Sequence, residues 1–261
     1  MTGQGRVAVI TGAAQGIGRA AAEYFTNRDI DRLVLNDVAG NESGVKETAA
    51  LVADRADVEM CLGDVTNESD AQEIAETARR AFGRLDVLYN NAGVVSGATV
   101  EHSTLDDWRR VIQVNLDGTF LPSKYCVPLI RESGGGAIVN VASVMSQGAS
   151  YRAAAYAASK TGVVGLTRAM AIDHARDNIR VNCVMPGAIN TPMMNGDPTV
   201  PDDKQPARVW APMHAFNRVG EAEEVAAAVY FLASTEASWV TGAALAVDGG
   251  MAIMLRPYED D

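Results

Sequence analysis

The chain has 261 residues, of which 48% are hydrophobic, and a formal net charge of -11. This length allows one large α/β domain or two small ones, and nothing along the sequence marks a second domain. The acidic balance argues against a nucleic-acid surface, and no apolar run reaches the roughly 18 residues of a membrane helix. Because no charged-then-apolar leader is visible, we expect a soluble protein of the cytoplasm.

Apolar, β-branched runs alternate with amphipathic stretches along the whole chain, a pattern typical of a parallel sheet covered by helices on both faces. The expected strands are Arg6–Thr11, Arg32–Asp37, Val58–Leu62, Leu85–Asn90, Ala137–Ser143, Arg180–Met185 and Ala244–Asp248. They predict an α/β protein with one doubly wound, seven-stranded parallel sheet in a single domain over residues 1–261.

Two helix starts can be recognised between these strands. Asn67 and Thr104 stand where an N-cap residue belongs, and Asp107 follows Thr104 by three residues as an acidic capping-box partner. Pro122 and Pro128 fall inside the helix that follows Thr104. Since proline lacks the N–H of a helical hydrogen bond, we expect a kink or an early break there.

The segment from Thr191 to Phe216 loses the apolar periodicity. It contains five of the nine prolines of the chain, namely Pro192, Pro198, Pro201, Pro206 and Pro212. A long connection in a compact domain is typically a binding loop. Four side chains of this segment favour a lid over an apolar ligand, namely Met193, Met194, Trp210 and Met213. The alternative is subunit packing.

The cysteines and histidines are too dispersed for metal or redox motifs. We expect no disulfide and no thiol chemistry, as in a reducing cytoplasm, and no metal site. The residues concerned are Cys61, Cys126, Cys183, His102, His174 and His214.

A glycine-rich turn follows the first expected strand, with the sequence Thr11-Gly12-Ala13-Ala14-Gln15-Gly16-Ile17-Gly18, and a helix is expected over Arg19–Asn27. Glycines there remove the β-carbons that would block a pyrophosphate from the helix N-terminus, where free amides and the dipole favour an anion. Strand, turn, helix and a second strand ending in an acid are the arrangement of a dinucleotide-binding Rossmann fold. The alternative is a turn that serves only helix packing.

Asp37 ends the second expected strand and is expected to accept hydrogen bonds from the adenosine ribose. A 2′-phosphate there would meet like charge, so NAD is favoured over NADP. Gln15 is neutral where a cation could recruit that phosphate, whereas Arg19 leaves NADP open. Asp37 could instead be a turn-forming aspartate.

Tyr156 and Lys160 are four residues apart on an expected helix and share one face. An ammonium beside a phenol favours the phenolate, and bringing the tyrosine pKa from about 10 to near 7 takes roughly 4 kcal/mol. One close ammonium in a partly dry cleft can supply much of this free energy. Taken alone, the spacing is also typical of an exposed helical pair.

Further motifs follow in a fixed order along the chain: Asp64-Val65, Asn90-Asn91-Ala92-Gly93, Asn115, Ser143, Tyr156 with Lys160, and Pro186-Gly187. With these motifs the chain resembles the short-chain dehydrogenase/reductase family, in its compact single-domain branch, from about Gly5 to Gly250. The resemblance implies reversible hydride transfer between NAD and a secondary alcohol or ketone.

The resemblance implies four catalytic residues. Tyr156 is the implied proton donor or acceptor at the substrate oxygen, and Lys160 lowers its pKa and binds the nicotinamide ribose. Ser143 is implied to hold the substrate oxygen, and Asn115 to link Lys160 to solvent through water. Ser143 could instead be a helix cap, and Asn115 a satisfied buried amide.

The resemblance also implies the cofactor contacts. Asp64 is expected to bond the adenine amino group, unless it is an ordinary loop cap, with Val65 against the ring and Asn90 on the adenosine side. Ile189 and Thr191 are expected to contact the carboxamide and to select the pro-S hydride. The cofactor-binding set is Gly12, Gln15, Gly16, Ile17, Gly18, Asp37, Asp64, Val65, Asn91, Ala92, Gly93, Tyr156, Lys160, Pro186, Gly187, Ile189 and Thr191.

The substrate is expected to be an alicyclic, terpenoid, aromatic or steroid-like alcohol in a mainly apolar pocket. The candidate wall residues are Met145, Gln147, Tyr151, Met193, Met194 and Trp210. Arg152 could pair with an anionic substrate, although an arginine at a helix start is typically exposed.

The resemblance further implies a homotetramer, in which the helices Thr104–Arg131 and Arg152–Ala175 pack against a twofold mate. The alternative is that the small residues of the second helix pack on its own sheet.

Two other functions are consistent with the sequence. One is an NADPH-dependent ketoreductase for a 3-oxoacyl or polyketide-like group on the same scaffold. The other is a nucleotide-sensing or scaffolding protein that lost catalysis, against which the intact set of catalytic residues argues.

Overall fold

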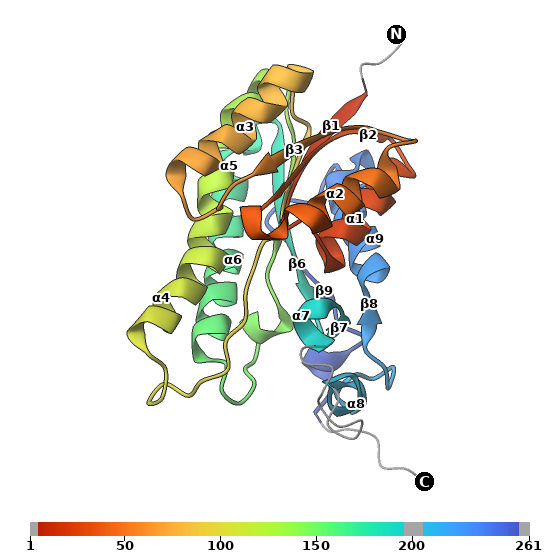
Figure 1. Cartoon of the computed structure of the whole chain (residues 1–261). Helices are drawn as coiled ribbons and strands as arrows, with labels where there is room; N and C mark the ends of the chain where they lie inside the picture. Colours follow the sequence, from red (N-terminus) through yellow and green to blue (C-terminus); the bar gives the residue numbers. More distant parts are fainter. Residues whose placement is uncertain (1–4, 196–205, 256–261) are drawn as a thin grey trace.

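A single parallel sheet forms the centre of the molecule (Figure 1). The computed structural model describes residues 5–195 and 206–255. The seven strands are arranged in the order β3-β2-β1-β4-β5-β6-β9, and every pairing is parallel. They are β1 Arg6–Thr11, β2 Ile30–Asp37, β3 Asp57–Leu62, β4 Val87–Asn90, β5 Gly136–Val141, β6 Ile179–Pro186 and β9 Ala244–Val247. The predicted fold class is confirmed.

Every predicted strand is present, and its ends differ from the predicted ones by no more than two residues. The difference that affects the site lies at the end of β5. This strand ends at Val141, and Ser143 is not part of it. Ser143 instead precedes a short 3-10 turn over Val144–Ser146.

Helices cover both faces of the sheet (Figure 1). One face carries α1, α2 and α9, and the other carries α3, α5 and α6. The helices are α1 Gly16–Thr26, α2 Glu42–Val52, α3 Glu68–Phe82, α4 Leu105–Ile112, α5 Gly118–Glu132, α6 Ala154–Asp173, α7 Pro192–Asn195, α8 Pro206–Trp210 and α9 Ala222–Ala233.

The strands alternate their side chains between two separate cores, as the period of an extended chain requires. Along β1, Ala8 and Ile10 belong to the core under α1 and α9, whereas Val7 and Val9 belong to the core under α3 and α5. Because both faces are buried, these strands read as continuous apolar runs in the sequence.

The predicted helix starts are confirmed. The Asn67 side chain accepts hydrogen bonds from the backbone N–H groups of Ser69 and Asp70, and the Thr104 hydroxyl accepts one from Asp107. Each side chain satisfies amides that have no partner inside the helix.

The predicted break at Pro122 and Pro128 is wrong, because α5 continues through both residues. The irregularity lies one turn earlier, where residues Gln113–Asp117 form a π-helical turn between α4 and α5. Turns of this kind are frequent at functional sites, and this one contains the buried Asn115.

The predicted lid segment is partly helical. α7 and α8 lie on either side of residues 196–205, and a 3-10 turn, Ala211–Met213, follows α8. Pro198 and Pro201 lie outside the described residues. The base of the segment is a short parallel pair of strands, β7 Ile189–Asn190 and β8 Gly220–Glu221, at the carboxyl end of β6.

Candidate active site

The turn between β1 and α1 is shaped by its glycines. Gly12 has a φ of +65° and Gly16 a φ of +56°, a conformation that L side chains rarely adopt. A Cβ on Gly18 would lie 2.1 Å from the carbonyl oxygen of Gly12. Gln15 caps α1 without a side-chain hydrogen bond. Backbone amides of the first helical turn are therefore available for an anion.

Asn91 and Thr11 hold this turn against the end of β4. The Asn91 side-chain amide donates to the carbonyl oxygens of Thr11 and Gly12, at 3.0 Å and 2.9 Å. In return the Thr11 hydroxyl accepts the backbone N–H groups of Asn91 and Ala92. The motif that follows β4 thus fixes the position of the glycine turn.

The carboxylate of Asp37 is fixed at the end of β2 by three donors. Its Oδ2 accepts the Ala14 N–H at 3.0 Å, and its Oδ1 accepts the Val38 N–H at 2.9 Å and the Asn41 side-chain amide at 2.8 Å. Asp37 therefore joins the glycine turn to the second strand. Arg19 points elsewhere, because its guanidinium contacts the Ala14 carbonyl, Thr48 and Glu47.

Asp64 caps its own turn, so its protein contacts are those of an ordinary loop cap. Its Oδ1 accepts both the backbone N–H and the hydroxyl of Thr66, at 2.8 Å each. Asp64 nevertheless lines the same cavity as the glycine turn, together with the buried Val65.

The prediction that Asn90 lines the adenosine side is wrong. Asn90 is buried, and its amide donates to Ser123 and to Asn140 inside the protein. The alternation of side chains along β4 explains this direction, because Asn90 and Asn91 point to opposite sides.

Lys160 extends from α6 into the site and is almost completely buried. Its Nζ donates to the Val141 carbonyl at 2.8 Å and lies beside Gly93, on which a Cβ would be 3.4 Å away. Burial disfavours the ammonium and lowers the pKa of Lys160 to about 8. A proton can therefore be exchanged at this lysine near neutral pH.

Asn115 is satisfied by neighbours in the protein. Its Oδ1 accepts the Val94 N–H at 2.8 Å, and its amide nitrogen donates to the Val94 carbonyl and to the Ser159 hydroxyl, each at 3.0 Å. The Asn115 side chain thereby joins the π-helical turn to α6 and to the segment that follows Gly93. The protein contacts of Asn115 are those of a satisfied buried amide.

Tyr156 and Lys160 face one another, with Nζ 5.8 Å from the ring centroid. In the protein chain by itself the pKa of Tyr156 is not lowered, and the effect of Lys160 on it stays a prediction. Burial raises the pKa of Tyr156, and the side chain of Ser143 opposes this effect. The physical reason is that the phenol has lost water, while the ammonium lies over the ring and donates to Val141.

Ser143 lies beside Tyr156 at the start of the 3-10 turn. Its backbone is extended, with a φ of -167°, and its hydroxyl accepts the Met145 N–H at 3.2 Å. The serine is thus a cap, as one sequence alternative proposed, and also a lining residue of the central cavity.

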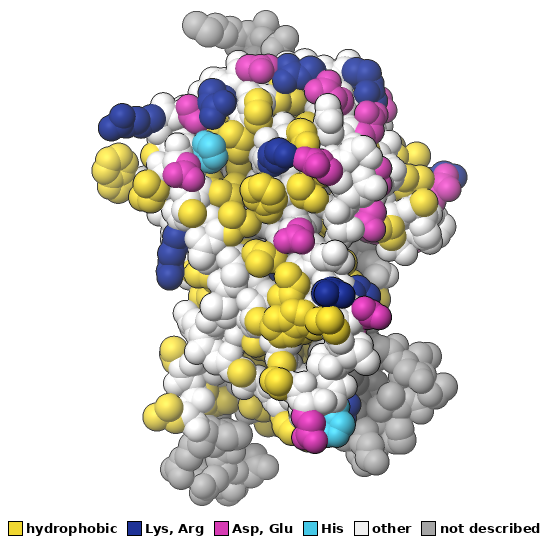
Figure 2. Space-filling model, turned by 90° about the vertical axis from the view of Figure 1, so that its left-hand side faces the viewer, with side chains coloured by type: hydrophobic (Ala, Val, Ile, Leu, Met, Phe, Trp, Pro, Cys, Tyr) yellow, Lys and Arg dark blue, Asp and Glu magenta, His cyan; other side chains and the backbone are white. Residues whose placement is uncertain are grey.

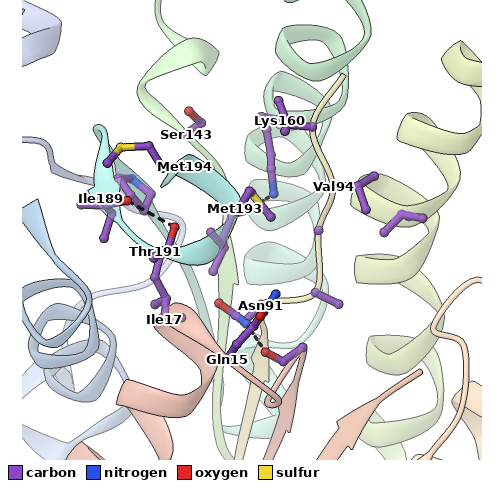
Figure 3. A pocket seen from close by; sticks show the side chains of 18 of the residues that line it. Gln15, Ile17, Asn91, Val94, Ser143, Lys160, Ile189, Thr191, Met193 and Met194 are labelled. Carbon is purple, nitrogen blue, oxygen red and sulfur yellow. Dashed lines mark hydrogen bonds between the residues drawn. The ribbon is translucent and has the colours of Figure 1, made fainter. Parts of the chain in front are cut away.

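One cavity of about 550 Å³ brings the predicted motifs together (Figure 3). Figure 3 shows Lys160, Ser143, Met193 and Gln15 around it, from elements far apart in the sequence. The predicted residues that line it are Gly12, Gln15, Gly16, Ile17, Asp37, Asp64, Val65, Asn91, Ala92, Gly93, Ser143, Met145, Tyr156, Lys160, Pro186, Gly187, Ile189, Thr191, Met193, Met194 and Trp210.

Besides Asn90, four predicted site residues do not line this cavity. Gly18 and Asn115 lie behind its wall, where they shape the turn and the π-helical segment. Gln147 is exposed, and Tyr151 is 84% exposed in a separate shallow pocket beside Arg152. The prediction that Gln147 and Tyr151 form the substrate wall is therefore wrong, because the chain after the 3-10 turn leads away from the cavity.

The sequence prediction missed several lining residues. Some directly follow a recognised motif, as Val38 follows Asp37 and Val94 follows Gly93, and this adjacency is the signal that could have found them. Others, such as Val114 and Met251, are brought to the cavity only by tertiary packing. The missed residues are Asn36, Val38, Asn41, Gly63, Val94, Val95, Val114, Val141, Ala142, Val144, Ala188, Pro192 and Met251.

The described residues contain no group of three or more histidine, cysteine, aspartate or glutamate side chains placed to hold a metal ion. None of the helices in the described part of the chain has the length and apolar character needed to cross a membrane. Cys61, Cys126 and Cys183 are free and buried.

Comparison with known proteins agrees with this geometry. A family model described as enoyl-(acyl carrier protein) reductase matches residues 12–252. The chain belongs to the short-chain dehydrogenase/reductase family and is an oxidoreductase that uses a nicotinamide cofactor on alcohols or ketones.

Individual relatives cover nearly the whole chain. The meso-2,3-butanediol dehydrogenase of Serratia marcescens is 42% identical over 246 residues, which are 94% of this chain and 94% of the relative. The 3-oxoacyl-[acyl-carrier-protein] reductase FabG of Thermotoga maritima is 38% identical over 252 residues, covering 96% of this chain and 99% of that protein. The crystal structure of levodione reductase superposes with a TM-score of 0.88 at 35% identity, covering 95% and 97% of the two chains.

Proposed function

We propose that the protein catalyses reversible hydride transfer between NAD and an apolar secondary alcohol or ketone, with Tyr156 as the acid and base. The observation that carries this proposal is the single cavity in which Tyr156, Lys160 and Ser143 meet the glycine turn and Asp37. The free amides at the start of α1 fit a pyrophosphate, and the three-donor carboxylate of Asp37 fits a ribose.

The proposed preference for NAD rests on charge. A phosphate about 4 Å from the Asp37 carboxylate would be repelled by about 4 kcal/mol at an effective dielectric of about 20. Arg19, which left NADP open in the sequence, is held by Thr48 and Glu47. Lys160 is the only cationic side chain among the described residues that line the cavity.

The cofactor, when bound, supplies the hydride acceptor or donor and, in its oxidised form, a positive charge. In the proposed mechanism Tyr156 removes the hydroxyl proton of the alcohol, or returns it to the ketone, through its phenolic oxygen. Ser143 donates a hydrogen bond to the substrate oxygen and orients it. Lys160 interacts with the nicotinamide ribose and favours the phenolate through its charge. Gly93 leaves room for the Lys160 side chain.

We propose an apolar substrate because four methionines are among the residues that line the cavity. Met145, Met193, Met194 and Met251 line it, together with Trp210. Thioether side chains are flexible and adapt to differently shaped apolar ligands. A polyol would leave its hydroxyl groups without partners on such a wall. Simple alicyclic and aromatic alcohols are the first compounds to assay.

The similarity to FabG supports one alternative, an NADPH-dependent ketoreductase. Equilibrium titration of the protein with NADH and with NADPH separates the two functions. The proposal expects NADH to bind more tightly. Tighter binding of NADPH would refute the role assigned to Asp37.

Replacement of the phenol tests the proposed chemistry. Tyr156→Phe should bind NADH with an unchanged Kd and lose at least about a thousandfold in kcat, because the proton donor is absent. Tyr151→Phe is the matched control, since it removes the same hydroxyl from an exposed tyrosine outside the cavity. Near-normal turnover by Tyr156→Phe would show that another group moves the proton.

We also propose a cytoplasmic homotetramer. The free cysteines suit a reducing compartment. Figure 2, which shows the side of the molecule with α4, α5 and α6, displays hydrophobic side chains across this face. On these helices Leu105, Trp108, Phe120 and Ile172 are exposed, and a Cβ on Gly165 would have nothing within 4 Å. Sedimentation velocity of the wild type and of Phe120→Asp tests this assembly, and an unchanged sedimentation coefficient would contradict it.

A further inference from the structure

His214 is a buried histidine to which the proposed chemistry gives no task. Its exposed fraction is 2%, and it follows the 3-10 turn Ala211–Met213 at the end of the lid segment. Both of its ring nitrogens have partners. Nε2 lies 3.1 Å from the backbone nitrogen of Ala188, and Nδ1 lies 2.8 Å from the carbonyl oxygen of Trp210.

The chemistry of these partners fixes the state of the imidazole. The Ala188 N–H is only a donor, so Nε2 must be unprotonated and accept its hydrogen. The Trp210 carbonyl is only an acceptor, so Nδ1 must carry the proton. His214 is therefore held as the neutral Nδ1–H tautomer, and an imidazolium could not make the bond to Ala188.

His214 joins three segments that form the cavity wall. Ala188 lies between β6 and β7, where Pro186, Gly187 and Ile189 also line the cavity, and Trp210 lines it from the end of α8. The third segment follows β9. A Cβ on Gly249 would lie 3.6 Å from the His214 Cβ, and Met251, two residues later, lines the cavity.

The imidazole ring of His214 fits closely against its neighbours. A Cβ on Gly187 would lie 2.7 Å from Nε2 and 3.1 Å from the Cα of Asp248. Asp248 uses its carboxylate oxygens on the N–H groups of Gly250 and Ala252. The ring thus fills the gap between β6 and the segment after β9, and its two hydrogen bonds connect Ala188 with Trp210.

We infer that His214 is a positioning residue that holds the Pro186–Ile189 wall and Trp210 in register, so that cofactor and substrate meet in one geometry. This inference rests on the proposed function. His214 itself is not among the residues that line the cavity, so its effect falls on binding and alignment rather than on proton transfer.

Three variants test the inference. His214→Leu removes both hydrogen bonds, whereas His214→Gln keeps one donor and one acceptor with nearly the spacing of the two ring nitrogens. His174→Leu is the matched control, because that histidine contacts Asp177 at the far end of α6. Each variant is assayed for the KM and kcat of an alicyclic alcohol and for the Kd of NADH.

His214→Leu should raise the KM for the alcohol and the Kd for NADH about tenfold, with a smaller change in kcat, because two buried polar groups lose their partners. His214→Gln should stay within about threefold of the wild type, and His174→Leu should match it. Unchanged binding by His214→Leu, or equal loss in both His214 variants, would overturn the inference.

A spectroscopic measurement tests the tautomer in the wild type itself, and His214→Gln serves only to assign the signals. The long-range ¹H–¹⁵N spectrum should show one neutral Nδ1–H imidazole at neutral pH, and its signals should be missing in His214→Gln. A protonated or Nε2–H ring at this position would also overturn the inference. If the wild type turns over no alcohol, the proposed function is wrong. The role of His214 is still tested in that case by NADH binding and by this spectrum.

Discussion

The buried charge of Lys160 leads to a prediction about stability. Burial lowers the pKa of Lys160 from its ordinary 10.5 to about 8 in the folded protein. Below pH 8 Lys160 is protonated in both the folded and the unfolded protein, and the full cost of burying its ammonium group destabilises the folded state. As the pH rises above 8, the folded protein releases this proton while the unfolded chain keeps it up to about 10.5. Stability therefore rises with pH in this window.

The magnitude follows from the size of the shift. A shift of about 2.5 units corresponds to about 3 kcal/mol, and about 2 kcal/mol of it is recovered between pH 7 and pH 9.5. Lys160→Met has no such proton. The difference in unfolding free energy between the wild type and Lys160→Met should therefore change by about 2 kcal/mol over this range, in favour of the wild type at the higher pH.

Urea unfolding at fixed protein concentration, followed by circular dichroism at several pH values, measures this difference. Lys46→Met is the matched control, since it removes an exposed lysine that pairs with Glu42. Its difference from the wild type should change by less than about 0.5 kcal/mol. A constant difference between the wild type and Lys160→Met from pH 7 to pH 9.5 would refute the reasoning.

Three further predictions concern the site. Gly18→Ala should weaken NADH binding more than about tenfold in a fluorescence titration, because its Cβ would lie 2.1 Å from the Gly12 carbonyl oxygen, whereas Gly40→Ala, with nothing within 4 Å, should bind normally. Because burial raises the pKa of Tyr156, kcat/KM for alcohol oxidation should increase toward alkaline pH and that for ketone reduction should decrease, and flat profiles would contradict this. Asp37→Ser should shift the ratio of the NADH and NADPH dissociation constants about tenfold or more toward NADPH, and an unmoved ratio would count against the charge argument.

The agreement between sequence and fold has a local cause. Strand and helix periodicities, and the steric demand of the glycine turn, depend on a few neighbouring residues. For this reason β1 and the caps at Asn67 and Thr104 were predicted correctly. The kink predicted from Pro122 was wrong, because the π-helical turn one turn earlier precedes a helix that continues through the proline.

The sequence by itself determined the sheet and the order of motifs along it, because parallel strands place their carboxyl ends, and the residues that follow them, along one edge. Only the tertiary structure decided that Asn90 turns inward, that Tyr151 lies outside the cavity, and that His214 joins its walls. It also decided that burial raises the pKa of Tyr156. Burial and partners across more than twenty residues of chain are properties of packing, which no local pattern encodes.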